Sequence, residues 1–187
     1  MTEKEKVTTS KFMSQVLRHR PEKIGITLDK NGWTNVDALI EGMNKSGRIP
    51  VTLDDVKYVV ATNDKQRFTF NEDFTKIRAN QGHSIPVDVE LEETAPPAVL
   101  YHGTSTGSLQ SILENGIIAR RRLYVHLSGD IETAIKVGKR HGKPVVLNID
   151  AVKMYKEGYK FFLSANGVWL TEKVPIEYVS AAEECPE

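Results

Sequence analysis

Two apolar stretches carry polar side chains at their ends, as do strands that supply groups to a pocket. Residues 99–105 read Val-Leu-Tyr-His-Gly-Thr-Ser, and residues 123–128 read Leu-Tyr-Val-His-Leu-Ser. Aromatic and β-branched residues of this kind favour strands. The pattern therefore predicts two strands that offer one histidine each, His102 and His126.

Arginines stand close to these histidines and flank a third one. Residues 120–122 are all arginine, and Arg18 and Arg20 flank His19 at the end of a predicted helix. A guanidinium binds phosphate oxygens in a planar, two-pronged geometry, so clusters of this type suit an anion. Taken one at a time, the arginines also fit solvated surface cations, and the histidines of the two strands fit buried core residues.

The composition excludes several classes of protein. The chain has 187 residues, of which 40% are hydrophobic and 27% charged, enough for one large or two small domains with real cores. Its net charge is zero, which argues against non-specific coating of nucleic acid and favours a local site for one or a few phosphates. No apolar run is long enough to cross a bilayer and the first residues lack a signal-peptide core, so we expect a cytoplasmic protein without a membrane partner.

Several common site types are excluded by the motifs. No G-x-G-x-x-G occurs, so a nicotinamide cofactor would not be held by a Rossmann turn. Residues 138–144 resemble a phosphate-binding P-loop only faintly, because the glycine spacing is one short and proline replaces the hydroxyl residue. The five histidines lack metalloprotease spacing, and the single cysteine, Cys185, provides neither a disulfide nor a thiolate zinc cluster, so no metal site is predicted.

The N-terminal half has the element order of a winged helix. Helices are predicted over 9–19, 36–44 and 53–61, with caps at residues 8–10, at Asn35 and at Thr52, and Pro21 ends the first. Residues 67–70 and 76–80 then form a predicted hairpin. Since side chains alternate along a strand, Arg67 is expected to point away from the core that Phe68 faces.

The C-terminal half is predicted to be α+β with a strand-rich core. Residues 86–98 are acidic and rich in proline, so we place the domain boundary there, between 1–95 and 96–187. The elements expected after it are strands at 99–102, 123–127, 144–150, 161–163, 167–171 and 176–179, and helices at 107–115, 131–141 and 151–157. Thr106 and Asp130 are the expected caps of the first two helices.

Eight short motifs, in order along nearly the whole chain, resemble those of one known family. They are residues 17–19 (LRH), 32–33 (GW), 64–68 (DKQRF), 77–84 (IRANQGHS), 100–104 (LYHGT), 125–128 (VHLS), 137–138 (VG) and 166–171 (NGVWLT). The family is that of the NAD-dependent RNA 2′-phosphotransferases, which remove the splice-junction 2′-phosphate from tRNA. The resemblance implies an α+β protein with an N-terminal winged-helix lobe followed by an ADP-ribosyltransferase-like, β-rich lobe.

The resemblance also implies roles for individual residues. The family's catalytic set carries over to Arg18, His19, Arg67 and Arg122. Arg122 is chosen because it lies four residues before His126, as in the family's motif, and the triple arginine leaves open whether Arg120 or Arg121 shares its role. The residues expected to bind NAD are His102, Gly103, Thr104, His126, Leu127, Ser128 and Val168.

The resemblance implies that the protein transfers a phosphate group without a metal ion. The 2′-phosphate of a tRNA-like RNA would pass to NAD through an ADP-ribosylated 2′-phosphate, and NAD would be consumed with release of nicotinamide and ADP-ribose 1″,2″-cyclic phosphate. A second enzyme class keeps the fold but ADP-ribosylates terminal phosphates of nucleic acid, or protein. A third class is a winged-helix nucleic-acid-binding protein that senses NAD. The physiological RNA and the proton role of His19 stay open, and with no coiled-coil pattern we expect a monomer.

Overall fold

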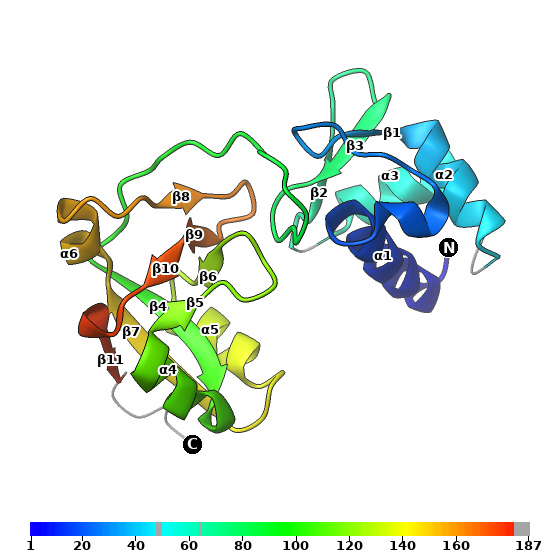
Figure 1. The fold of residues 1–187 in the computed structure, drawn as a ribbon. Coiled ribbons are helices and arrows are strands. Elements are labelled where there is room, and N and C mark those ends of the chain that lie inside the picture. The colour runs from blue at the N-terminus through cyan, green and yellow to red at the C-terminus, as the bar shows by residue number, and fades with distance from the viewer. Residues whose placement is uncertain (48–49, 64, 182–187) are drawn as a thin grey trace. The chain divides into compact units, whose positions relative to one another are not determined.

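The chain forms two compact units, Met1–Glu90 and Leu91–Glu187, each with its own hydrophobic core (Figure 1). A computed structural model describes residues 1–47, 50–63 and 65–181, so Asp64 and Cys185 lie outside the described residues. Both units mix helices and strands, and the predicted α+β class is confirmed. The sequence placed the boundary after residue 95, five residues beyond the division between the units.

Three helices of the first unit begin at side chains that cap them. These helices are α1 (Glu3–Arg18), α2 (Val36–Lys45) and α3 (Leu53–Ala61), with a 3₁₀ helix, η1 (Pro21–Ile24), after the first. Asn35 caps α2 and Thr52 forms a capping box with Asp55, as predicted. The predicted start of α1 at residue 9 is wrong, because Thr2 and Glu5 form a capping box that starts the helix at Glu3.

The first unit closes its core with a small antiparallel sheet. Its strands are β1 (Thr34–Asn35), β2 (Phe68–Phe70) and β3 (Lys76–Ala79), in the order β1-β3-β2. The predicted hairpin is β2 and β3, with Phe68 opposite Ala79. Phe68 is buried against α1 residues such as Val16 and Leu17. The sheet therefore fixes where the end of α1 lies relative to the start of β2, while the winged-helix assignment stays a prediction.

The second unit contains two three-stranded antiparallel sheets and a two-stranded ribbon. The first sheet has the order β11-β7-β4, from β11 (Val179–Ala181), β7 (Pro144–Asp150) and β4 (Val99–Ser105). The second has the order β6-β9-β8, from β6 (Val125–Leu127), β9 (Trp169–Thr171) and β8 (Phe162–Leu163). The ribbon pairs β5 (Ile117–Ile118) with β10 (Lys173–Val174). Tyr101 and Ser128 exchange two backbone hydrogen bonds of 2.9 and 2.7 Å, which join β4 to the end of β6.

The helices of the second unit begin or end at residues other than those predicted. They are α4 (Leu109–Asn115), α5 (Ile131–Gly138) and α6 (Ala151–Lys156), with 3₁₀ helices η2 (Thr106–Ser108) and η3 (Ile176–Tyr178). Asp130 caps α5 as predicted, but Thr106 does not cap α4, because η2 occupies the expected first turn. The strand expected at 176–179 is wrong for its first three residues, which form η3 after Pro175. Among the described residues no helix has the length and apolar character to cross a bilayer.

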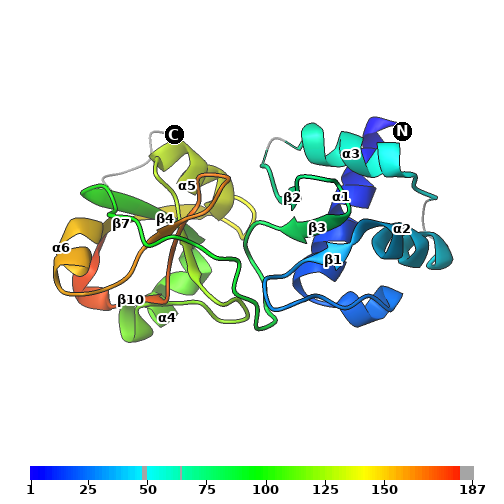
Figure 2. The ribbon, with the colours of Figure 1, turned by 90° about the horizontal axis from the view of Figure 1, so that it is seen from above.

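Helix α5 packs against β4 at two glycines, and this contact fixes the strand that carries His102 (Figure 2). A Cβ atom on Gly103 would lie 1.8 Å from the carbonyl oxygen of Ala134. A Cβ atom on Gly138 would lie 2.6 Å from the carbonyl oxygen of Thr104. The helix was predicted to run to His141, but it ends at Gly138.

Replacing Gly103 with alanine should destabilise the second unit. The new methyl group would clash with backbone of α5 that no side-chain rotation can move away, so we expect a loss of about 3 kcal/mol in the free energy of unfolding. Urea unfolding of the wild type and of Gly103→Ala measures it. Gly107→Ala is the matched control, since a Cβ atom there meets nothing within 4 Å. Equal losses in the two variants would contradict the packing role of Gly103.

Candidate active site

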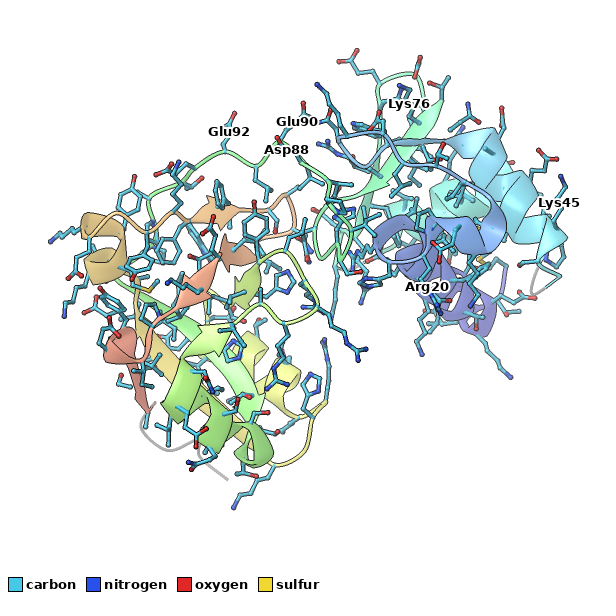
Figure 3. The ribbon with its side chains drawn as sticks, viewed as in Figure 1. Arg20, Lys45, Lys76, Asp88, Glu90 and Glu92 are labelled. Atoms are coloured by element: carbon cyan, nitrogen blue, oxygen red, sulfur yellow. The ribbon has the colours of Figure 1, made fainter. Side chains whose placement is uncertain are left out.

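Arg18 is the last residue of α1, and its side chain reaches the start of β2. Its Nη2 donates a hydrogen bond of 3.4 Å to the carbonyl oxygen of Arg67, and its guanidinium lies 6.0 Å from the centroid of the Phe68 ring. Arg20, two residues on, lies at the surface of this unit and pairs with Glu22 at 3.7 Å (Figure 3). The helix end thus directs Arg18 to β2, while Arg20 fits a solvated surface cation.

His19 caps the C-terminus of α1 and is held by a segment far along the chain. Its backbone N–H donates to the carbonyl oxygen of Gln15 at 3.1 Å. Its Nδ1 and the hydroxyl oxygen of Ser84 are hydrogen-bonded at 2.9 Å, and the backbone N–H of Ser84 donates to the carbonyl oxygen of Arg18 at 3.0 Å. Ser84 therefore fixes both the imidazole ring and the backbone before it.

Arg67 directly precedes β2 and is half-buried. Its Nη1 donates a hydrogen bond of 3.1 Å to Oδ1 of Asn63, and the side-chain amide of Asn63 donates to the hydroxyl oxygen of Ser10 at 3.0 Å. Its carbonyl oxygen accepts from Arg18 and also from the backbone N–H of Asn80 at 2.9 Å. The first unit thus brings together Arg18, His19 and Arg67.

His83 lies buried behind these residues, with 2% of its surface exposed. Its ring is hydrogen-bonded to the backbone of Leu17, and its Nε2 has no hydrogen-bond partner among the described residues. Burial lowers the pKa of His83 to about 4, and the positive charges of Arg18, His19 and Arg78 act in the same direction. The ring is therefore neutral near pH 7.

The two strand histidines of the second unit are connected directly. Nδ1 of His102, on β4, lies 3.2 Å from the carbonyl oxygen of His126, on β6. Burial lowers the pKa of His102, although this hydrogen bond opposes the shift. Because a backbone carbonyl only accepts, Nδ1 of His102 carries the proton of a neutral ring. The sequence motifs of β4 and β6 thus form one cluster.

Arg122 is the arginine of the triplet that contacts His126, through a hydrogen bond from Nη1 to Nδ1 of the ring. A guanidinium has only donors, so Nδ1 accepts and the neutral His126 ring carries its proton on Nε2. Partial burial lowers the pKa of Arg122, and so does the positive charge of Arg140. All three arginines of the triplet are exposed by surface area, so the contact with His126 is what distinguishes Arg122, while Arg120 has a backbone φ of 53°. The spacing that selected Arg122 agrees with this contact.

The other residues expected to bind NAD surround the two histidines, with different environments. Thr104 and Leu127 are buried, 7% and 2% exposed, and Ser128 is held by the backbone bonds to Tyr101. Val168 exchanges hydrogen bonds with Ser164 just before β9, which pairs with β6. Gly103 allows the close approach of α5, so packing by itself requires that glycine. Among the described residues no group of three or more His, Cys, Asp and Glu side chains could hold a metal ion.

Comparison with known proteins identifies the family. The model of the RNA 2'-phosphotransferase, Tpt1 / KptA family matches residues 4–173. The chain belongs to this family. It is 54% identical over 171 residues to a probable RNA 2'-phosphotransferase of Flavobacterium johnsoniae, which covers 91% of this chain and 93% of that protein. It is 49% identical over 179 residues to a probable RNA 2'-phosphotransferase of Trichormus variabilis, covering 96% and 98% of the two chains.

The family resemblance read from the short motifs is thus confirmed, but the motifs alone gave no role to several residues of the site. Ser84 and His83 fall in the matching stretch 77–84, which was the available signal. Asn63 and Arg140 lie outside every motif quoted. Their contacts with Arg67 and Arg122 depend on where the chain folds, and no local pattern predicts them.

The stability of the first unit should fall as the pH falls from 6.5 to about 4, the folded pKa of His83. In this range the unfolded chain binds a proton that folded His83 does not, so the stabilisation is complete above 6.5 and lost toward 4, by up to about 3 kcal/mol. Urea unfolding at several pH values measures the slope, which His83→Leu should flatten and the exposed His141→Gln should not. Parallel slopes for wild type and His83→Leu would contradict the burial of a neutral ring.

Proposed function

We propose that this member of the RNA 2'-phosphotransferase family removes a 2′-phosphate from RNA by transferring it to NAD. The observation that supports the proposal is that Arg18, next to His19 in the chain, donates to the backbone carbonyl of Arg67, while Ser84 holds the ring of His19 and Asn63 holds the guanidinium of Arg67. Cationic donors and an imidazole grouped in this way suit a phosphate dianion and the proton transfers that its chemistry needs.

In the first step an oxygen of the RNA 2′-phosphate attacks the anomeric carbon of the nicotinamide ribose. The bond from that carbon to the nicotinamide nitrogen breaks, and nicotinamide leaves as a neutral molecule, so the step needs little acid catalysis. The product is RNA with ADP-ribose on its 2′-phosphate. We assign the binding of NAD to the cluster on β4 and β6, where the neutral rings of His102 and His126 can bond ribose hydroxyls. Gly103, Thr104, Leu127, Ser128 and Val168 surround them.

In the second step the neighbouring hydroxyl of the ADP-ribose attacks the phosphorus. The bond from phosphorus to the RNA 2′-oxygen breaks, which releases 2′-hydroxyl RNA and ADP-ribose 1″,2″-cyclic phosphate. The attacking hydroxyl loses a proton and the leaving oxygen gains one, and we assign this proton transfer to His19. Arg18 and Arg67 neutralise the charge on the phosphate oxygens, and the family resemblance assigns Arg122 to the same catalytic set. Each guanidinium is worth roughly 3 to 4 kcal/mol by analogy with oxyanion-hole donors. In this proposal the guanidiniums do what a metal ion does in other phosphoryl transfers.

Product analysis tests the proposed function. Incubation of the protein with NAD and an oligoribonucleotide bearing an internal 2′-phosphate should give nicotinamide, 2′-hydroxyl RNA and ADP-ribose cyclic phosphate, with EDTA present throughout. The same oligonucleotide without the 2′-phosphate is the control, and it should leave NAD intact. A stable ADP-ribosyl nucleic acid as end product would indicate the ADP-ribosyltransferase instead. Unchanged NAD with the phosphorylated RNA would exclude the 2′-phosphotransferase.

Arg122→Ala should lose most of this activity, about 100-fold or more, because it removes the guanidinium that contacts His126. Arg121→Ala is the matched control, since its side chain is exposed on the same loop, and it should change the rate less than about threefold. The measurement is the rate of nicotinamide release at saturating NAD and RNA, with thermal unfolding of each variant. An essential Arg121 beside a dispensable Arg122 would show that the choice within the triplet is wrong.

A further inference from the structure

The C-terminus of α1 carries two of the three site residues of its unit, and its backbone carbonyls need partners. The last four backbone carbonyls of a helix have no N–H donor within the helix, so other groups must donate hydrogen bonds to them. The carbonyl oxygen of Gln15 accepts from the backbone N–H groups of His19 and Arg20, at 3.1 and 3.0 Å. The carbonyls of Leu17 and Arg18 are instead satisfied from another part of the chain.

That part is residues 82–84, directly after β3, which we call the 82–84 turn. The backbone N–H of Ser84 donates to Arg18, and its hydroxyl holds Nδ1 of His19. Gly82 has a φ of 87° and lies against the guanidinium of Arg18, since a Cβ atom there would be 3.6 Å from Nη1. Three consecutive residues of the turn thus contact the end of α1.

His83 supplies the buried contact of this turn. Its Nε2 has no hydrogen-bond partner in the part of the chain that the structure describes, so Nδ1 is the atom that donates to the Leu17 carbonyl. The ring is 2% exposed and lies beside Gly32, where a Cβ atom would be 3.4 Å from Nε2. An unpaired buried acceptor is costly in general, but here the ring stands among the positive charges of Arg18 and Arg78, which favour a lone pair over another proton. A neutral donor adds no competing charge behind a site for an anion.

We propose that His83 is a positioning residue that holds the end of α1 through the Leu17 carbonyl, so that Arg18 and His19 keep the orientation in which they act on the phosphate. The proposal rests on the proposed function. His83 itself lies beneath the site and contacts no reacting group. Its effect should therefore appear in the rate of turnover and not in the binding of NAD, which is assigned to the other unit.

The test compares two replacements of His83 that are similar in size, of which only one can donate the hydrogen bond. Leucine fills the volume without a donor, while the side-chain amide nitrogen of asparagine stands where Nδ1 of histidine stands and can restore the bond to Leu17. We expect His83→Leu to lower kcat about 10- to 100-fold, as a small misplacement of catalytic groups does, with the KM for NAD unchanged. His83→Asn should recover most of kcat. Ser84→Ala, at the exposed end of the turn, should lower kcat with no effect on the KM for NAD.

Destabilisation has its own control in the same unit. Val59, on α3, is 1% exposed in the core and is not part of the 82–84 turn, so Val59→Ala loosens the unit without removing these contacts. Thermal unfolding is measured for every variant. If kcat merely follows thermal stability across Val59→Ala, His83→Leu and His83→Asn, His83 is structural only and the proposal is overturned.

Two further outcomes separate this proposal from the proposed function. A wild-type protein that leaves NAD and the 2′-phosphorylated RNA unchanged contradicts the proposed function before any variant is compared. An active wild type with a His83→Leu variant of equal kcat contradicts the positioning role alone. Should His83→Leu fail to fold, His83→Asn and Ser84→Ala still decide, because a positioning turn requires the first to be active and the second to be impaired.

Discussion

Each of the three arginines assigned to catalysis donates a hydrogen bond to a neutral acceptor, and that contact orients the guanidinium without placing a carboxylate charge at the acceptor. Arg18 donates to a backbone carbonyl, Arg67 to the side-chain amide of Asn63, and Arg122 to the ring of His126. A carboxylate in these places would hold the guanidinium as well, but it would cancel most of the field that a phosphate dianion meets. A neutral acceptor fixes the direction of the donor without adding a negative charge at that contact.

His83, His102 and His126 are likewise neutral rings. His83 and His102 have lowered pKa values because burial disfavours their protonated forms, and His126 must be neutral to accept from Arg122. Their tautomers follow from their partners, since Leu17 and His126 offer carbonyls and Arg122 offers only N–H groups. A neutral ring has one donor and one acceptor nitrogen, and these contacts already occupy Nδ1 of His102 and Nδ1 of His126. The positive charge of the site thus comes from arginines, whose protonation does not depend on pH near neutrality.

Sequence predicted those features whose cause is local. The caps at Asn35, Thr52 and Asp130 act within four residues, so they could be read directly, and the buried strand Pro144–Asp150 was predicted to the residue. Features set by distant partners were missed. The ribbon of β5 and β10 pairs residues more than fifty positions apart, and the end of α5 at Gly138 reflects the approach of a neighbouring strand. Arg67 was chosen by resemblance, and its role stays a prediction.

The arrangement of the candidate site residues likewise depends on both local and distant parts of the sequence. Arg18 and His19 stood out because Pro21 ends their helix and places cations at its last turn, a local signal. What makes them usable is not local: Ser84 lies 65 residues after His19, and Arg67 lies 49 residues after Arg18. A helix end frays when its carbonyls are unsatisfied, so the two side chains would have no fixed direction without the 82–84 turn. The sequence identifies Arg18 and His19 as candidate phosphate-binding residues. The 82–84 turn, directly after β3, contacts the end of the helix that carries them.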